Sequence, residues 1–392
     1  MLRKRTLGQD TKNENVKLDT KKAPESSEGP HRESKKTLWS RVCNVGKVIL
    51  LIIFIPPFLN YASLQRETVL LVPKEGISVD IGLGQKIHLL CKGQGQPVVL
   101  LDAPTGMSSD AWFHIQEDIS QTTKVCSYDR VGLGFSKRAF QNDTTGMERV
   151  WRVSTTGRMV DDLHRLIKAA KIATPLILVG SELGSLNGRF YSHIHNMEVS
   201  DLVLIDPIPE DVFEDDQWHQ YWYSQLVPSL QAMQFSAATG LSRIFIILGW
   251  MHPAIEGENV SEDLIQRQKF CLSNPSHQSS AVDEHFFLNE SVSQVRELSR
   301  FKPLSSITSV SVITGDYFDA QLPPHLNKVV AERQKRFLEQ SYPSATRVHV
   351  PGADRKMVYK KPSAIGTMFL QLGCSAAFAG GKMKTSVNTE SS

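Results

Sequence analysis

The sequence has few cysteines, little net charge and no glycine-rich phosphate loop, and each absence excludes a class of protein. Its five cysteines form no Cys-x-x-Cys pair and have no histidine at metal-ligand spacing, so nothing supports a zinc site. A formal net charge of +3 argues against nucleic acid as the main partner. With 392 residues and 41% hydrophobic side chains, the chain can bury a large core. We therefore predict a globular protein with no metal, no cofactor and no nucleic-acid partner.

The basic residues are concentrated in an N-terminal tail. Residues 1–47 contain 12 Lys and Arg residues against 6 Asp and Glu residues, a local charge of +6, whereas the rest of the chain carries −3. Residues 1–46 have almost no apolar side chains and are predicted to be disordered, because they cannot bury enough surface to offset chain entropy. Residues 374–392 are predicted to be disordered as well.

An apolar run follows this tail, and residues 48–65 contain no charged side chain. This length is near the lower limit for crossing a bilayer, so we predict a single transmembrane anchor over residues 47–65, kinked by Pro56 and Pro57. A buried or interfacial helix is the alternative, and the long polar stretch before the run disfavours a signal peptide. Because Lys and Arg precede the run, the N-terminus is expected in the cytoplasm. The rest of the chain is then lumenal or extracellular, beside an internal membrane or the plasma membrane.

That location bears on two residue types. Sequons at Asn142, Asn259 and Asn289 fall in the part predicted to leave the cytoplasm and are glycosylation candidates. For the cysteines we expect buried free thiols, although a lumenal domain would allow one disulfide, whose members the sequence does not identify.

After residue 66, short β-rich apolar runs alternate with longer amphipathic stretches, which is typical of a parallel sheet covered by helices. The predicted strands cover residues 68–72, 78–81, 86–90, 97–101, 124–128, 176–179, 201–205, 310–314 and 346–350. The predicted helices cover residues 109–121, 155–171, 182–195, 324–340 and 363–371.

About a hundred residues, 207–306, interrupt this alternation and are predicted to form an inserted helical cap, because structureless loops of that length are rare. Residues 241–251 are the most apolar part of the cap. We expect them to pack onto the sheet, with contact to a lipid surface as the alternative. Aromatic residues at 218 and 221–223 are expected to pack in the cap core, and lining a pocket for an apolar ligand is their alternative role.

Four segments carry a resemblance to a known family: residues 97–103, 128–136, 176–188 and 202–207. The second reads Tyr-Asp-Arg-x-Gly-x-Gly-x-Ser. Their order and spacing resemble the α/β-hydrolase fold superfamily over residues 68–372. The resemblance implies an α/β domain over residues 66–373, with a mostly parallel eight-stranded sheet flanked by helices and a cap near residues 207–306.

In this family a tight strand-to-helix turn carries a serine nucleophile, and small residues surround it because the backbone passes so closely. Gly180 and Gly184 supply that space here, but Glu182 stands in place of the serine. Arg355 stands where the resemblance implies the catalytic histidine, and a guanidinium stays protonated at neutral pH. His349 lies in a predicted strand and is not favoured as a replacement base.

The other site positions are also implied by the resemblance. Asp316 matches the carboxylate of the catalytic triad, with Asp319 as the alternative. The two oxyanion-hole donors map to Leu183 and Pro104, and proline has no N–H, so Thr105 would have to donate instead if the alignment shifts by one residue.

Glutamate and arginine at these two positions replace a nucleophile and a base by opposite charges. We predict that Glu182 and Arg355 form an ion pair, with Asp316 as a second partner of the arginine. The protein is then a pseudoenzyme that binds an apolar small molecule or a protein partner. Two alternatives stay open: unconventional hydrolysis that uses Glu182, and an esterase-like or lipase-like hydrolase whose serine is Ser185 or Ser108.

Overall fold

The computed structural model describes residues 31–139, 154–256, 260–316, 319 and 322–371. The chain has two compact units, Met1–Ile52 and Ile53–Ser392. The first unit is described from the start of helix α1 (His31–Leu70), and the second contains the rest of that helix together with the sheet and all other helices. The tails predicted to be disordered lie, over residues 1–30 and 374–392, outside the described residues.

Helix α1 differs from the prediction at both ends. It begins at His31, well before the predicted start of the anchor, and its segment Trp39–Leu70 is long and apolar enough to cross a membrane. It also continues to Leu70, so the prediction of a strand over residues 68–72 is wrong. The Thr68 hydroxyl donates to the Leu64 carbonyl at 2.7 Å and the Leu71 N–H to the Glu67 carbonyl at 2.9 Å, which extends the helix through β-branched residues.

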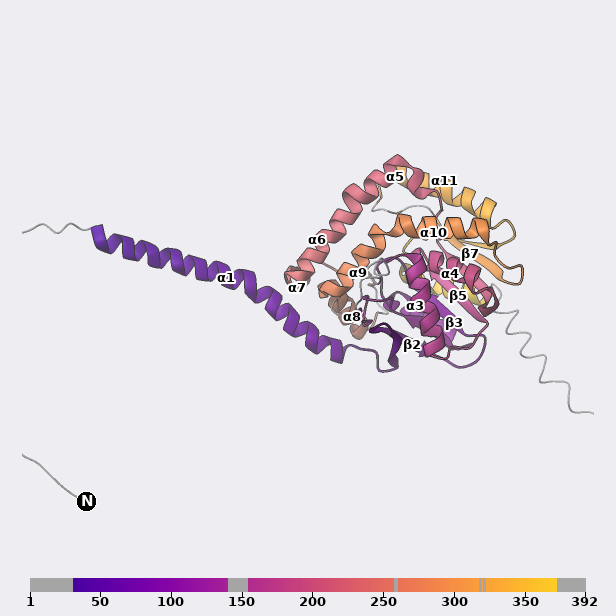
Figure 1. Cartoon of the computed structure of the whole chain (residues 1–392), viewed down its shortest axis with the longest axis horizontal. Coiled ribbons are helices and arrows are strands. Elements are labelled where there is room, and N and C mark those ends of the chain that lie inside the picture. Colours follow the sequence, from indigo (N-terminus) through magenta and orange to yellow (C-terminus); the bar gives the residue numbers. More distant parts are fainter. Residues whose placement is uncertain (1–30, 140–153, 257–259, 317–318, 320–321, 372–392) are drawn as a thin grey trace, which may run out of the picture. The chain divides into compact units, whose positions relative to one another are not determined.

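A sheet forms the centre of the second unit (Figure 1). It has eight strands in the order β1-β2-β4-β3-β5-β6-β7-β8. β1 and β2 are antiparallel, β2 runs antiparallel to β4, and all later pairs are parallel, as the sequence predicts. The strands are β1 (Gly76–Gly82), β2 (Gln85–Lys92), β3 (Val99–Asp102), β4 (Val125–Tyr128), β5 (Leu176–Ser181), β6 (Val199–Ile205), β7 (Ser309–Gly315) and β8 (Thr346–Val350).

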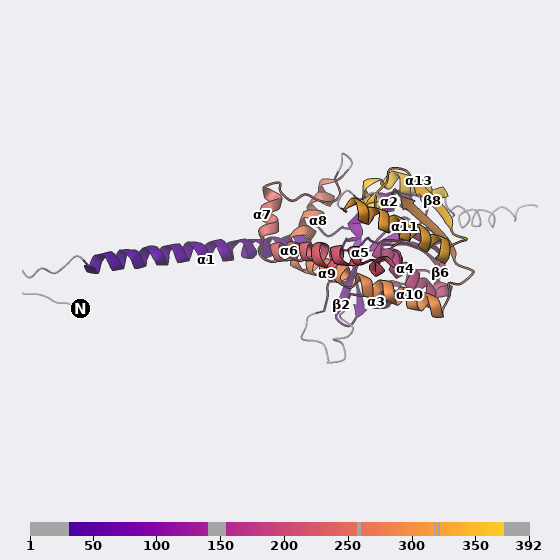
Figure 2. The ribbon, with the colours of Figure 1, turned by 90° about the horizontal axis from the view of Figure 1, so that it is seen from above.

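Side chains alternate along these strands and build one apolar core on each face of the sheet. Leu100 and Leu178 face a core completed by α3 (Thr156–Ala169), whereas Leu101 and Val179 face a core completed by α2 (Phe113–Ser120). Helix α4 (Leu183–Ile194) lies with α3, and α12 (Met357–Lys360) and α13 (Pro362–Gln371) lie with α2 (Figure 2). Helix α11 (Pro324–Ser341) connects β7 to β8. The two-sided core fixes the register of every parallel strand and therefore the positions of the loops at their ends.

The chain between β6 and β7 forms the predicted helical cap. Its helices are α5 (Asp216–Tyr221), the π-helical turn Trp222–Leu226, α6 (Val227–Ala238), α7 (Leu241–Ile247), α8 (Glu262–Ser273), α9 (Pro275–Phe286) and α10 (Leu288–Phe301). Trp218 and Trp222 are buried in a cluster that joins the cap to α4, as expected for packing residues. Of the glycosylation candidates, Asn289 lies in the first turn of α10, and Asn142 and Asn259 lie outside the described residues.

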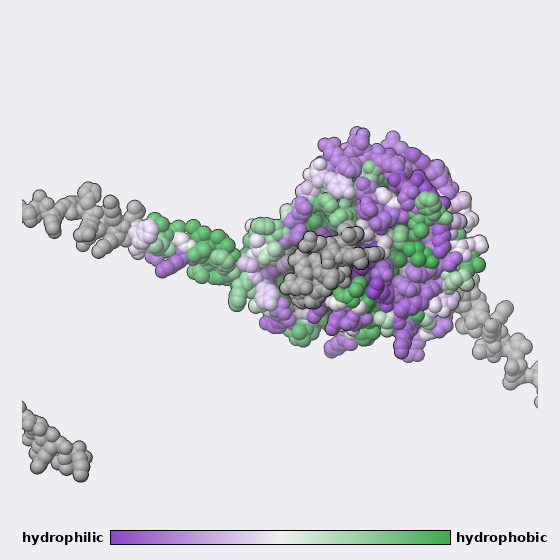
Figure 3. Space-filling view, in the orientation of Figure 1, coloured by the Kyte–Doolittle hydropathy of each residue, from purple (hydrophilic) through white to green (hydrophobic). Residues whose placement is uncertain are grey.

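Helix α7 does not pack onto the sheet, and this prediction is wrong. Ile247 is 77% exposed and Trp250, just after the helix, is 72% exposed. Figure 3 shows apolar side chains at the edge of the domain where Figure 1 places α7. The helix packs instead against α6 and α8 and, through Gly240 and Arg243, against residues 56–67 of α1.

A disulfide joins β2 to β4. Cys91 and Cys126 lie directly opposite each other in the antiparallel register, and their Cα atoms are 4.0 Å apart. The expectation of free thiols is therefore wrong for these two residues. Cys271 is free and buried and Cys43 is free and exposed, while Cys374 lies outside the described residues.

Candidate functional site

The turn between β5 and α4 lifts Glu182 out of the sheet. Its backbone has φ +49° and ψ −112°, a strained conformation for a residue with a side chain. A Cβ atom at Gly180 would lie 2.1 Å from the Gly184 carbonyl oxygen, and one at Gly184 would lie 2.4 Å from the Asp102 carbonyl oxygen. Only glycine fits at these two positions, so the sequence around Glu182 is dictated by the close approach of three backbone segments.

The Glu182 carboxylate pairs with Arg355 from the loop after β8. Glu182 Oε1 lies 3.4 Å from Arg355 Nη2, and Arg355 Nε lies 3.6 Å from Asp206 Oδ2, at the end of β6. The predicted ion pair is therefore formed. Burial lowers the pKa of Arg355, but the charges of Glu182, Asp206 and Asp319 outweigh it and leave that pKa raised. Arg355 thus stays protonated and cannot accept a proton from a substrate or water.

Asp206 takes the place that was predicted for Asp316 beside the arginine. Burial raises the pKa of Asp206 to about 6, although the charge of Arg355 and the hydrogen bond from Gln334 Nε2 lower it. Asp316 instead accepts from the Gly352 N–H at 2.5 Å and lies 2.9 Å from His349 Nε2 on the exposed side of β7 and β8. Asp319, the alternative to Asp316, is buried and lines the same cavity as Arg355.

Two backbone N–H groups after β3 also meet carboxylates. The Thr105 N–H donates to Glu182 Oε2 at 3.4 Å, and the Gly106 N–H donates to Glu284 Oε2 at 2.7 Å. Pro104, the position predicted from the nearest alignment, contributes only its carbonyl, which accepts from Arg130 Nη2 at 2.8 Å. Leu183 begins α4, and its side chain is fully buried. The N–H groups that could stabilise an oxyanion in this loop therefore already have anionic partners.

The Tyr-Asp-Arg motif holds the cap onto the sheet. Arg130 is buried and binds Asp102 Oδ1 at 2.6 Å and Glu284 of α9 with Nε and Nη2 at 2.7 and 2.8 Å. Asp129 accepts from the backbone N–H groups of Ser109 and Phe135. We call the contact of Arg130 with Asp102 and Glu284 the cap clamp; it connects β3, β4 and α9 by charge-assisted bonds in the interior.

The serines considered as alternative nucleophiles are not presented by a turn. Ser185 Oγ is directed to the Glu182 carbonyl at 2.5 Å, and its residue is fully buried. Ser181 is fully buried in β5. Ser108 lies in the cavity wall after β3 and is 9% exposed.

A cavity of about 360 Å³ lies between the sheet and the cap, and Glu182 and Arg355 are part of its wall. The apolar wall comes mostly from the cap: Trp222, Leu226, Leu230, Met233, Ile255, Leu272 and Ala281. This volume lies in the range of small-molecule sites, and a mostly apolar wall with a few charged side chains suits an apolar ligand with a polar group.

Two histidines of the cap line this cavity, and the sequence analysis does not select them. Burial lowers the pKa of His285, and its Nδ1 lies 2.7 Å from the Ala281 carbonyl, which leaves Nε2 as an acceptor. Burial lowers the pKa of His277 to about 4, and its Nδ1 accepts from the Gly134 N–H. Both rings are neutral at pH 7. Sequence alone gives no signal for them, because they lie in a polar helix, α9, far in sequence from the four family segments.

Comparison with known proteins shows the fold. The family described as alpha/beta hydrolase fold matches residues 96–233. The Cif epoxide hydrolase from Acinetobacter nosocomialis superposes with a TM-score of 0.59 over 81% of this chain and 96% of that chain, at 15% identity. The chain has the α/β-hydrolase fold. The mostly parallel sheet, the turn at Glu182 and the inserted cap are thus parts of one known architecture.

Two proteins with similar sequences match only a segment of this chain. The uncharacterized protein YqjL of Bacillus subtilis is 28% identical over 116 residues, which are 30% of this chain and 42% of YqjL. The uncharacterized hydrolase YraK of the same organism is 31% identical over 126 residues, 32% of this chain and 42% of YraK. The match spans less than half the length of both relatives.

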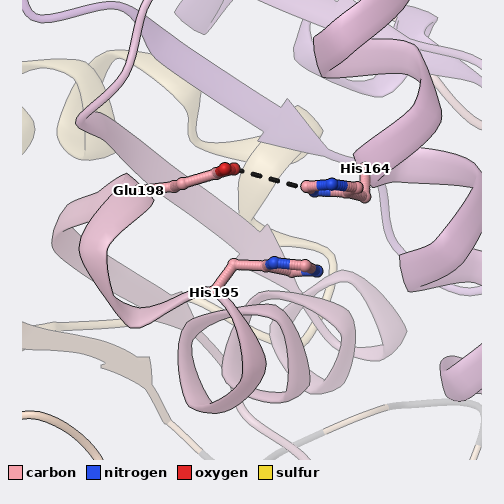
Figure 4. A group of neighbouring side chains, drawn as sticks. All are labelled: His164, His195 and Glu198. Atoms are coloured by element: carbon pink, nitrogen blue, oxygen red, sulfur yellow. Dashed lines mark ion pairs between the residues drawn. The ribbon is translucent and has the colours of Figure 1, made fainter.

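A second cluster consists of His164 of α3, His195 at the end of α4 and Glu198 in the turn that follows, and none of the three lines the cavity (Figure 4). The two imidazole rings are stacked 4.0 Å apart at an angle of 5°. A metal ion lies in the plane of each imidazole that binds it, and two parallel planes share no such point. Glu198 already accepts from Lys168 Nζ at 2.6 Å and the Tyr191 hydroxyl at 2.5 Å. As arranged, these residues form a hydrogen-bonded cluster that fastens the end of α4.

Proposed function

We propose that this chain is a membrane-anchored protein of the α/β-hydrolase fold that has no serine-hydrolase activity and binds an apolar small molecule in the cavity beneath its cap. The observation that carries the proposal is the bonding of Glu182. Its carboxylate occupies the tip of the strand-to-helix turn, pairs with Arg355 and accepts the Thr105 N–H. Glu182 and Arg355 stand at the positions of the nucleophile and the base, and the Thr105 N–H is a candidate oxyanion donor. In this structure the Glu182 carboxylate contacts both the guanidinium and this N–H.

Chemistry at this site meets two obstacles. The Arg355 guanidinium cannot activate a hydroxyl or a water, because it does not release its proton at neutral pH. A developing oxyanion would have to compete with the Glu182 carboxylate for the Thr105 N–H and would be repelled by it. Neither obstacle affects the apolar part of the cavity wall. The cavity can therefore bind a ligand although the site cannot catalyse hydrolysis by a serine mechanism.

The membrane and its orientation are supported by two independent features. Helix α1 contains a candidate span, and the basic residues precede it. The Cys91–Cys126 disulfide fits a lumenal or extracellular domain, because cytosolic thiols are kept reduced. Glycosylation at Asn289 would fit the same side of the membrane.

A fluorophosphonate probe tests the absence of a reactive serine. The purified full chain is expected not to react, with an active serine hydrolase labelled in parallel as the control. Labelling would overturn the proposal and would direct attention to Ser108. Ligand binding is tested by native mass spectrometry of the chain as purified, in which an apolar adduct is expected. Leu230→Trp, which fills the cavity, should lose the adduct.

A second candidate function is hydrolysis through Glu182 as the nucleophile. A solved structure of similar fold is an epoxide hydrolase, and neutral His285 lines the cavity that contains Glu182. In this reaction a carboxylate oxygen of Glu182 attacks an epoxide carbon, the C–O bond of the ring breaks and the alkoxide takes a proton from solvent. Water deprotonated at His285 Nε2 then attacks the ester carbonyl and releases a diol, and the imidazolium returns its proton to solvent.

Isotope labelling separates the two candidates. The chain is incubated with styrene oxide in heavy-oxygen water and the peptide containing Glu182 is weighed by mass spectrometry. Binding without catalysis predicts no heavy oxygen in this peptide and no diol. Heavy oxygen that appears in the wild type and is lost in His285→Asn would establish hydrolysis and overturn the pseudoenzyme proposal.

A further inference from the structure

We propose that the end of the cap formed by α6 and α7 is embedded in the lipid bilayer beside α1. This inference rests on the membrane anchoring of the proposed function and adds a second membrane contact to it. The embedded surface, called the cap patch, consists of Phe235, Leu241, Ile244, Ile247, Leu248 and Trp250.

The cap patch is exposed far beyond what a water-facing helix requires. Phe235 is 66% exposed, Ile247 77% and Trp250 72%. These side chains belong to the last turns of α6, to α7 and to the turn after it, and Figure 3 shows apolar side chains at this edge of the domain. A surface of this kind marks an interaction site in a folded protein. A tryptophan at its border fits the interfacial zone of a membrane.

The position of the cap patch along α1 sets its depth. A Cβ atom at Gly240, the residue before α7, would lie 2.4 Å from the Pro56 carbonyl oxygen. Asn60 is buried, and its Nδ2 donates to the Ala237 carbonyl at 3.0 Å and to the Ser273 carbonyl at 2.9 Å. The start of α7 thus lies beside residues 56–60, within the charge-free run 48–65. If that run is in the bilayer, α7 is at the same depth.

Charge balance favours this placement. Arg243 is the cation of α7, and both of its terminal nitrogens bind Glu67 at 2.8 Å. Its Nε donates to Asn60 Oδ1 at 3.0 Å. The arginine therefore faces α1 with its charge compensated, which lowers the cost of placing α7 near hydrocarbon. The neighbouring surface of α1 is equally apolar, since Phe54 is 64% exposed and Phe58 69%.

A lipid bilayer is the occupant that covers both surfaces at once. Phe54 and Phe58 belong to the candidate membrane span, which lipid would surround. The cap patch is a second exposed apolar surface beside this span. A partner protein would have to replace lipid around α1 as well as cover the cap. We therefore assign the patch to the bilayer and treat a protein partner as an outcome of the test.

The cap patch also lies next to the cavity. Leu226, Leu230 and Met233 line the cavity wall at helical spacing along α6, whereas Phe235 of the same helix belongs to the cap patch. Helix α6 thus separates the cavity from the proposed lipid. An apolar ligand would reach the cavity from the bilayer around this helix without passing through water.

Lipid quenching tests the placement in the full chain reconstituted in phosphatidylcholine vesicles. In a background of Cys43→Ser and Cys374→Ser, the remaining free thiol, Cys271, is buried and is not labelled. A cysteine that carries an environment-sensitive fluorophore is then introduced by Ile247→Cys in the patch. Ile52→Cys reports on the anchor. Ile307→Cys, 62% exposed in the wild type and in the loop just before β7, is the matched control. Spin-labelled lipid is expected to reduce emission at positions 52 and 247 by at least twofold and to leave position 307 unchanged.

Each of the other outcomes overturns the membrane anchor, the membrane contact of the cap patch, or both. Quenching at 52 without quenching at 247 leaves the anchor in place and overturns the cap patch contact. If position 247 is then also protected from aqueous iodide, a protein partner covers it. No quenching at 52 overturns the anchor and the contact together. Native tryptophans give a second measurement: Trp250→Phe should remove part of the emission that brominated lipid quenches, as Trp39→Phe does, and an unchanged quenched fraction would contradict the contact.

Discussion

Glu182 and Arg355 depend on each other because both are largely buried. Glu182 Oε1 lies 3.4 Å from the guanidinium, and Asp206 lies 3.6 Å from it on the other side. Removing one charge of a buried pair leaves the other without compensation, whereas replacing both by neutral side chains of similar size is far less costly.

The first prediction concerns this pair. Arg355→Ala should lower the free energy of unfolding by about 3 kcal/mol, because Glu182 and Asp206 lose their cation. Glu182→Gln combined with Arg355→Met should recover more than half of that loss. Urea unfolding of the full chain in detergent, followed by circular dichroism, measures both variants. Arg300→Ala, which removes an exposed ion pair with Glu297, is the control and should change little. Equal losses in the single and double variants would contradict a coupled pair.

The second prediction is a pH dependence that comes from Asp206. Its pKa is raised from 3.8 to about 6 in the folded chain, so between these values the folded state binds a proton more tightly than the unfolded state. Its contribution to stability is therefore complete below about pH 4 and falls as the pH rises through 6, by at most about 3 kcal/mol. Asp206→Asn should remove this part of the profile. Unfolding curves at pH 4, 5, 6 and 7 measure it, and parallel profiles of variant and wild type would exclude the effect.

At the residue scale, sequence identifies what a local motif fixes. Glu182, Gly180 and Gly184 follow from the spacing of one turn, and Arg355 from its place after the last strand. Asp206 belongs to one of the four family segments, but its contact with Arg355 depends on how the strands are arranged in the sheet. His285 comes from the cap, and no local pattern predicts that it lines the cavity. Asp316 was matched to the carboxylate of the catalytic triad by its position after a strand. Asp319, three residues later, is the one that is buried and lines the cavity.

The elements show where local preference is overridden by packing. The β-branched residues after Glu67 favour a strand, yet Leu64 packs on Phe270 and Glu67 binds Arg243, so the helix continues to Leu70. Residues 241–251 have the composition of a core segment and lie on the outside of the cap. Hydrophobicity predicts burial from water, and it does not distinguish a protein core from a membrane.

The third prediction concerns the junction of α1 and α7. Gly240→Ala should destabilise the chain by about 2–3 kcal/mol, because the new Cβ atom meets the Pro56 carbonyl in addition to the strain of a positive φ. Gly249→Ala is the matched control, since Gly249 has a similar φ and no neighbour within 4 Å, and it should cost about 1 kcal/mol. Thermal unfolding of both variants gives the comparison. Equal shifts would mean that α7 is not held against α1.

Over the whole molecule, the disulfide ties the antiparallel end of the sheet to its parallel part. Cys91 and Cys126 are 35 residues apart in sequence, and the loop they close contains β3 and α2. The order of the strands was predictable from the family segments. The pairing of these cysteines was not, because it depends on the register between β2 and β4.

The fourth prediction follows from this cross-link. Cys91→Ala with Cys126→Ala should lower the free energy of unfolding by about 2–4 kcal/mol, whereas Cys43→Ser should leave it unchanged. Peptide mapping of the full chain without reductant should recover Cys91 and Cys126 in one linked species. Recovery of both as free thiols from cells would place the domain in a reducing compartment and contradict the proposed orientation.

The cap clamp has a consequence for how fast the cavity exchanges its contents. Swinging the cap away from the sheet would separate Arg130 from Glu284 and leave both charges in the interior. Such opening is rare, so a ligand leaves through small movements of α6, which forms part of the cavity wall. We expect residence times governed by the flexibility of that one helix, long enough for a ligand to survive purification. The ligand found in the cavity after purification would then be one that the protein bound in the cell.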